Sequence, residues 1–295
     1  MALNLALCLC VYLLFTKGAE GSIDDVDCVE IYKQPAFQHP SLKNHKIQEI
    51  FSSYEDLERS DNYEKKEQCP KGTVPIFRQR NGSESFHLNT TEYLGQHFAV
   101  IETMIDGSIY RGAEAEISQL NSIEAGWAGD GFGKTGCYNT QCPGFAVLSR
   151  NHRIGNQFLG SSVYGKISHC FTLQIFQDVS SGNWILKLDN EVICYWPKEL
   201  FTELNKGASV VRYGGNTFMS SNGKWTLSSS RFFRDGTFLK CLIIDSNYIR
   251  VYSIEYRKLR CYADVYDCFE VTYWGYGRSS GDSFSFGGPG GKCGV

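Results

Sequence analysis

The stretch KISHCFTLQIFQDVSSGNWILKLDNEVICYW, residues 166–196, decides the fold because it holds three β-rich runs in succession. The runs KISHCFTLQIF, NWILKL and EVICYW are dominated by aromatic and branched apolar residues, which is typical of strands. The glycine-containing turn SSGN, residues 180–183, separates the first run from the second. This stretch therefore predicts neighbouring strands joined by short turns.

The same pattern continues on both sides of this stretch, from His97 almost to the C-terminus. Short β-rich runs alternate with turns such as RDG, residues 234–236. Many short strands without intervening helices predict an all-β domain, either an antiparallel sandwich or a barrel. The further runs are HFAVIET, SIYRGAEAEI, GFAVLSR, ASVVRYGG, KWTLSS, TFLKCLIID, IRVYSIEY and FEVTYW.

Two segments have helical patterns instead. KNHKIQEIFSSYEDLER, residues 43–59, predicts an amphipathic helix, and PKELFTELNKG, residues 197–207, predicts a second helix between Pro197 and Gly207. The apolar face of the first helix consists of Ile47, Ile50, Phe51, Tyr54 and Leu57.

Composition and motifs exclude several classes of protein. The 295 residues carry a net charge of -3 and no basic block, so a nucleic-acid partner is not expected. The sequence lacks CxxC and HExxH motifs and phosphate-binding glycine loops, and its GxSxG match, GRSSG at residues 277–281, is not followed by the helical pattern that a nucleophile elbow needs. We therefore expect no metal, no cofactor and no serine-hydrolase site.

The N-terminus predicts secretion. The apolar run MALNLALCLCVYLLF is too short for a membrane span, and it precedes small residues that suit cleavage after Gly18 or Gly21. We therefore expect residues 1–21 to be a signal peptide, with no membrane contact after its removal. The sequons at Asn81 and Asn89 agree with an extracellular or vacuolar destination.

Ten cysteines remain after such cleavage, and an even number in a secreted chain predicts disulfides. We expect Cys261 to pair with Cys293 and so to fix the glycine-rich tail. Four cysteines, Cys170, Cys194, Cys241 and Cys268, are left with three possible pairings.

Composition divides the chain into two parts. Residues 22–90 are more polar, whereas residues 91–295 hold the predicted strands. We expect the first part to be a detachable pro-segment that covers a cleft of the second part.

One acidic residue stands inside a strand-like run, LNSIEAGWAG, residues 120–129. Alternation places Glu124 on one face with Ser122 and Gly126, and these small neighbours leave space above the carboxylate. This arrangement suits the floor of a cleft, but it also suits an ordinary solvent-facing strand.

Longer blocks carry a resemblance to a known family. CVEIYKQPAFQHPSLKNHKIQ, residues 28–48, resembles the activation peptide of the plant neprosin family. NSIEAGW, TGCYNTQCPGF, GNWILKL, YWPKELF, VVRYGGN and FGGPGG resemble blocks of its catalytic domain, in the same order. The resemblance implies a secreted zymogen with a small N-terminal α/β pro-segment and a mature antiparallel β-sandwich. It also implies a glutamic endopeptidase that cuts proline-containing peptides or proteins after proline at acid pH.

In the neprosin family two glutamates perform the chemistry, and the resemblance assigns the first to Glu124. The second falls at Asn216, which can donate a hydrogen bond but cannot give or take a proton. The segments on both sides of Glu124 are also shorter than in the family. Glu114 and Glu116 are alternative carboxylates, although solvent-facing acids are the simpler interpretation. Arg212 is a candidate to stabilise the charge of Glu124.

The family pattern also implies two disulfides, Cys28–Cys69 within the pro-segment and Cys137–Cys142 around a short turn. An alternative function is a non-catalytic secreted protein that binds peptide or carbohydrate through the same cleft. The oligomeric state is not indicated by the sequence.

Overall fold

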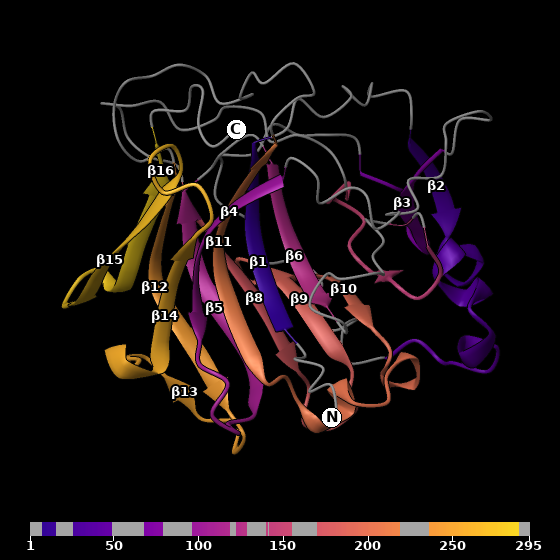
Figure 1. Ribbon diagram of the computed structural model, residues 1–295. Helices are drawn as coiled ribbons and strands as arrows, with labels where there is room; N and C mark the ends of the chain where they lie inside the picture. The colour runs from indigo at the N-terminus through magenta and orange to yellow at the C-terminus, as the bar shows by residue number, and fades with distance from the viewer. Residues whose placement is uncertain are drawn as a thin grey trace.

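The computed structural model describes residues 8–15, 26–48, 68–78, 96–118, 122–128, 140, 142–154, 170–218 and 236–288. These residues form two large β-sheets and one two-stranded sheet (Figure 1). The described part of the chain contains no α-helix, only short 3₁₀ turns. The expected all-β sandwich is confirmed. No helical segment within these ranges has the length and apolar character needed to cross a membrane.

The larger sheet contains the three successive β-rich runs within residues 170–196. β8, β9 and β10 are antiparallel neighbours, as the pattern predicted. The turn between β8 and β9 closes because the Asp178 carboxylate accepts a hydrogen bond from the Ser181 backbone N–H, and Gly182 adopts a φ of 77°. The sheet runs in the order β15 (Glu270–Gly277), β16 (Gly281–Gly287), β12 (Gly236–Asp245), β5 (Tyr110–Ser118), β8 (Cys170–Gln177), β9 (Trp184–Leu188), β10 (Glu191–Trp196) and β7 (Ala146–Val147), with β13 (Arg250–Val251) paired to β12.

The smaller sheet includes the N-terminal apolar run. Residues 8–15, expected to be part of a signal peptide, form β1 between β11 and β6 (Figure 1). β1 is parallel to β11 and antiparallel to β6. Within the described residues, β6 pairs with β1 alone. The order is β14 (Leu259–Ala263), β4 (Gln96–Thr103), β11 (Val210–Phe218), β1 (Cys8–Phe15) and β6 (Ser122–Ala128).

Aromatic side chains fill the space between the two large sheets. Tyr213 on β11 packs against Phe238 and Phe284 of the larger sheet, and its hydroxyl donates to the Leu242 carbonyl at 2.6 Å. A Cβ on Gly215 would lie 2.1 Å from the ring of Phe286, so glycine is required for this close packing. Positions 213 and 215 therefore face the core. By alternation, positions 212, 214 and 216 lie on the outer face of the smaller sheet.

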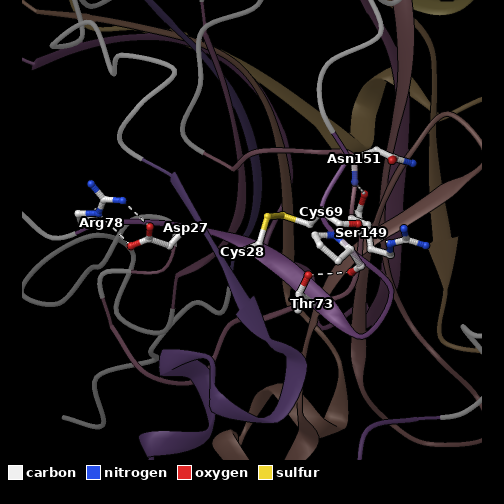
Figure 2. The surroundings of a disulfide bond; sticks show 9 residues. Asp27, Cys28, Cys69, Thr73, Arg78, Ser149 and Asn151 are labelled. Atoms are coloured by element: carbon white, nitrogen blue, oxygen red, sulfur yellow. Dashed lines mark hydrogen bonds and ion pairs between the residues drawn. A yellow bond between two sulfur atoms is a disulfide. The ribbon is translucent and has the colours of Figure 1, made fainter.

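The N-terminal segment forms a separate unit against one end of the larger sheet. β2 (Val26–Glu30) and β3 (Thr73–Phe77) are antiparallel, and the Cys28–Cys69 disulfide joins this unit as predicted (Figure 2). Instead of an α-helix, the described part holds three 3₁₀ turns: η2 (Ile31–Lys33), η3 (Pro35–Gln38) and η4 (Pro40–Leu42).

Both helix predictions need correction. Residues 45–48 are not helical, and residues 49–59 lie outside the described ranges. Residues 197–207 form two 3₁₀ turns, η6 (Lys198–Leu200) and η7 (Leu204–Lys206), instead of one helix. The Asn205 side-chain amide donates to the Phe201 carbonyl at 2.6 Å and to the Lys198 carbonyl at 3.1 Å. These carbonyls are acceptors that an α-helix would satisfy with backbone N–H groups.

Candidate active site

The two predicted catalytic positions lie in the smaller sheet, on the strands that flank β1. Glu124 on β6 stands opposite Tyr12, which in turn stands opposite Gly214 on β11. Asn216 stands opposite Leu14, two residues further along β1. Because directly opposite residues share a face and faces alternate along a strand, the backbone places positions 124 and 216 on the same face.

The same register separates the two positions. Two strand spacings amount to about 10 Å, and two residues along a strand add about 7 Å in the perpendicular direction. The Cα atoms of Glu124 and Asn216 are therefore about 12 Å apart by this geometry. The structure brings them to one face but not into adjacent positions, because β1 lies between them.

β6 is attached to the core from its inner face. Ala125 packs against the main hydrophobic core, and Trp127 contacts Phe201 edge-on with ring centroids 4.7 Å apart. On the outer face, a Cβ on Gly126 would meet no atom within 4 Å. The strand thus combines an anchored inner face with open space at Gly126, the outer-face position next to that of Glu124.

A buried acid on the same outer face pairs with two arginines. The Glu102 side chain on β4 is 7% exposed and accepts a hydrogen bond from Arg212 Nε at 2.7 Å. Arg260 on β14 also binds this carboxylate. Arg212, expected to stabilise Glu124, is therefore paired with Glu102. Among the described side chains, two guanidinium groups surround one carboxylate, which gives this part of the cluster a net positive charge.

Sequence reasoning did not select Glu102. Its partners lie 110 and 158 residues away along the chain. The only local signal was a glutamate near the end of the run HFAVIET, which a solvent-facing strand also produces.

The alternative carboxylates Glu114 and Glu116 lie in the other sheet, on β5. Glu114 pairs with Arg250 at 3.0 Å, and Glu116 pairs with Lys240 at 2.5 Å. Both are partly exposed acids with cross-strand partners, in agreement with the solvent-facing interpretation.

A second buried acid lies between the sheets and was also missed. The Asp282 carboxylate accepts hydrogen bonds from the Tyr273 hydroxyl at 2.7 Å and from the Ile254 backbone N–H at 2.5 Å. It borders a cavity of about 10 Å³ that Cys241 also lines. Burial, with a smaller effect of Asp282, raises the pKa of the Cys241 thiol well above its usual value. This cavity has room for about one water molecule, so it does not suit a substrate.

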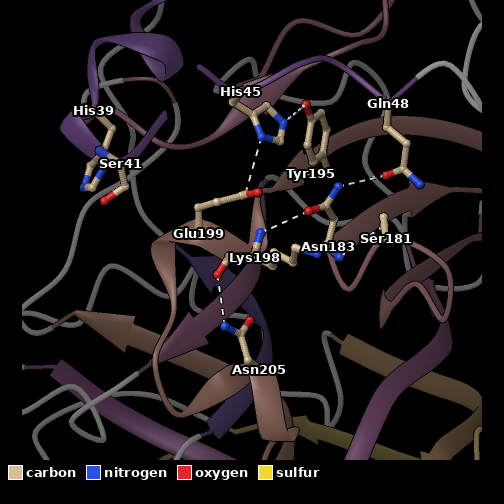
Figure 3. Close-up of polar contacts among 10 residues, drawn as sticks. All are labelled: His39, Ser41, His45, Gln48, Ser181, Asn183, Tyr195, Lys198, Glu199 and Asn205. Carbon is tan, nitrogen blue, oxygen red and sulfur yellow. Dashed lines mark hydrogen bonds and ion pairs between the residues drawn. The ribbon is translucent and has the colours of Figure 1, made fainter. Parts of the chain in front are cut away.

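The N-terminal segment docks on the larger sheet. We expected it to cover the cleft, but its described residues contact β7, β10, the turn after β8, the 3₁₀ turn η6 and Arg150. The Gln34 side chain bonds both the N–H and the carbonyl of Val147 on β7. Figure 3 shows His45 beside Tyr195, with Nε2 at 2.8 Å from the hydroxyl, and Gln48 beside Asn183.

The cysteine pattern differs from the prediction at the C-terminus. Cys142 and Cys268 each take part in a disulfide, whereas Cys261 carries a free thiol. The predicted pairing of Cys261 with Cys293 is therefore wrong. Cys194 and Cys241 are also free and buried. Cys137, Cys293, Asn81 and Asn89 lie outside the described residues.

No group of three or more His, Cys, Asp or Glu side chains is placed to hold a metal ion in the described ranges. The candidate site therefore consists of the outer face of the smaller sheet around positions 124 and 216, with the Glu102 cluster beside it.

Comparison with known protein families gives two matches. A family model described as Neprosin matches residues 118–289, which is more than half of the chain. A second family model, described as Neprosin activation peptide, matches residues 17–86. β1 precedes both matched ranges.

Proposed function

We infer, from the fact that this chain belongs to the neprosin family of proteases, that it is a secreted protein that holds proline-containing peptides at Glu124. We further propose that it cleaves them after proline at acid pH, but only very slowly. The observation that supports this proposal is the register that places positions 124 and 216 on one outer face of the sheet.

The chemistry of the two residues explains the low rate. An ionised Glu124 can act as a general base that activates water against a peptide carbonyl. The Asn216 amide can donate a hydrogen bond to the oxygen of that carbonyl, but it cannot supply a proton to the leaving group. General acid catalysis typically contributes about 10²- to 10⁴-fold, and this contribution is absent at position 216.

The electrostatics of the outer face favour an ionised base. Arg212 and Arg260 carry two positive charges against the single negative charge of Glu102. A net positive cluster favours the charged form of a nearby carboxylate. The position of Glu124 is two strand spacings and two residues from that of Arg212, so this interaction acts over about 12 Å, which makes it weak and sensitive to salt.

Secretion would change the site. Cleavage of a signal peptide after Gly18 or Gly21 removes β1 and leaves the space between positions 124 and 216 without its present occupant. We propose that the secreted protein meets its peptides in this processed form.

A second candidate function is peptide binding without catalysis, which the asparagine at position 216 favours. Cleavage of a fluorogenic proline-containing peptide by the secreted protein, measured over roughly pH 3 to 7, separates the two. The Glu124→Gln variant is the matched control, since it keeps the shape of the side chain. Slow cleavage that disappears in the variant supports the peptidase. Equal rates in both proteins contradict it, and binding without cleavage supports the second candidate.

A further inference from the structure

We propose that the space between β6 and β11, which β1 fills in this structure, is an acceptor site for an extended peptide strand. Its ligand is a segment with large apolar residues at alternate positions. A strand added between two existing strands gains main-chain hydrogen bonds on both sides, which is a recurring mode of peptide recognition.

The first support is the extent of pairing. β1 pairs with β11 from Cys8 to Phe15 and with β6 from Cys8 to Leu14. Without an occupant, the facing edges of β6 and β11 would expose unpaired backbone N–H and C=O groups. A site with two such edges favours an extended backbone over any other ligand shape.

The second support is the origin of the occupant. Both flanking strands belong to the range matched by the Neprosin family model, whereas β1 precedes both matched ranges. Only residues 119–121 connect β5 to β6, and these two strands belong to different sheets. This connection is too short to provide a strand beside β6, and among the described residues the space is filled by β1, which lies outside both matched ranges.

The third support is that β6 contacts the core through its inner face. Trp127 packs edge-on against Phe201, whose side chain is buried beside the 3₁₀ turn η6. Ala125 packs against the main core. These contacts attach β6 to the core through its inner face, in addition to its pairing with β1.

The register defines the direction and pattern of the ligand. The ligand would run parallel to β11 and antiparallel to β6, as β1 does. In β1, the positions that share the core-facing side with Tyr213 are Leu9, Val11, Leu13 and Phe15, all of them apolar. Proline inside the segment would remove a backbone donor, so a strand ligand differs from the proposed proline-containing substrate. A bound strand ligand would lie between positions 124 and 216 and block access to them.

The site can be tested in the full chain with a specific protease sequence inserted between residues 16 and 25. After cutting, native mass spectrometry shows whether the N-terminal fragment stays bound. The probe is a labelled peptide with the sequence of residues 8–15, carrying Cys8→Ser and Cys10→Ser for solubility. The same peptide with Leu13→Pro is the matched control.

We expect the fragment to remain bound after cutting and to be displaced by the probe. We expect the proline peptide to bind at least about tenfold more weakly, since it lacks one ladder donor and clashes with the sheet. Hydrogen exchange in β6 and β11 should slow when the probe binds. A protein that unfolds on cutting and refolds with the probe also supports the site.

Release of the fragment with unchanged exchange in β6 and β11 overturns the proposal, as does equal binding of the two peptides. Unfolding that the probe does not reverse has the same consequence. The proposed catalysis is tested separately, because it predicts that Glu124→Gln abolishes cleavage, whereas the acceptor site is tested by the binding of the two peptides to the wild-type protein.

Discussion

Phe286 occupies the space that a side chain at position 215 would need. A Cβ built on Gly215 lies 2.1 Å from the Phe286 ring, which is fully buried between the sheets. This contact determines which face of β11 meets the core. It therefore also determines that position 216, one residue further, belongs to the outer face.

The variant Gly215→Ala should lower the free energy of unfolding by about 1 to 3 kcal/mol, because the added methyl group overpacks the core. Chemical denaturation followed by circular dichroism measures this loss. Gly126→Ala is the matched control on the open face, where nothing lies within 4 Å, and we expect a change below about 0.5 kcal/mol. Equal effects of the two substitutions would contradict the assignment of faces.

The Cys28–Cys69 bond closes a loop with a sequence separation of 41 residues. Replacing both cysteines by serine should destabilise the N-terminal unit by about 4 kcal/mol on the chain-entropy model. Faster hydrogen exchange in β2 and β3, with little change in β8 and β9, would show that the effect is local. Unchanged exchange in β2 and β3 would contradict a stabilising role for this bond.

The free thiols should differ in reactivity. Burial raises the pKa of Cys194 and Cys241 well above the usual value, so these thiols stay protonated and shielded. Partial burial also raises the pKa of Cys261, but this thiol is exposed at the edge strand β14, so of the three it should be alkylated first in the native protein. Mass spectrometry after a short iodoacetamide treatment, without reductant, reports the modified residues. Recovery of Cys261 in a disulfide would contradict the structure.

The turn after β8, where Gln48 of the N-terminal segment binds Asp178, should lose stability in strong acid. Burial alone would raise the pKa of Asp178, but hydrogen bonds from Ser180, Ser181 and Gln48 outweigh it and lower the pKa below 3.8. A lowered folded pKa means that the stabilisation is present above about pH 3.8 and is lost as pH falls through the folded value.

The test is the midpoint of chemical denaturation, measured at several pH values between about 2 and 6. Asp178→Asn should reduce the decline on the acid side, since the amide does not titrate there. Glu203→Gln is a suitable control, because this exposed carboxylate pairs with Lys206 within its own turn. An identical acid decline in the wild type and Asp178→Asn would show that Asp178 does not contribute.

Local patterns predicted the strands well because their information lies within a few residues. The runs in 166–196 became β8, β9 and β10, and Glu124 lies on a strand as its alternation indicated. The predicted helix at 197–207 is wrong because the Asn205 side chain binds carbonyls that the backbone N–H groups of a helix would bind. These hydrogen bonds depend on the conformation of the whole turn.

Other features depend on contacts between distant parts of the chain. An apolar run of eight residues fits a leader and a strand alike, and the pairing of residues 8–15 with β6 and β11 depends on residues more than 100 positions away in the sequence. The disulfide state of Cys261 and Cys268 also depends on such contacts, because nothing in the local sequence shows that Cys268 is bonded and Cys261 is free.

The most direct test of the account is the rate of peptide cleavage after a carboxylate is restored at position 216. In the secreted protein, Asn216→Glu should raise the rate for a proline-containing peptide at acid pH by on the order of a hundredfold, because it supplies the missing acid. Asn216→Gln, of equal length but without a titrating group, should leave the rate low. Equal rates in the wild type and Asn216→Glu, both abolished by Glu124→Gln, would show that asparagine already suffices at this position and would contradict the account.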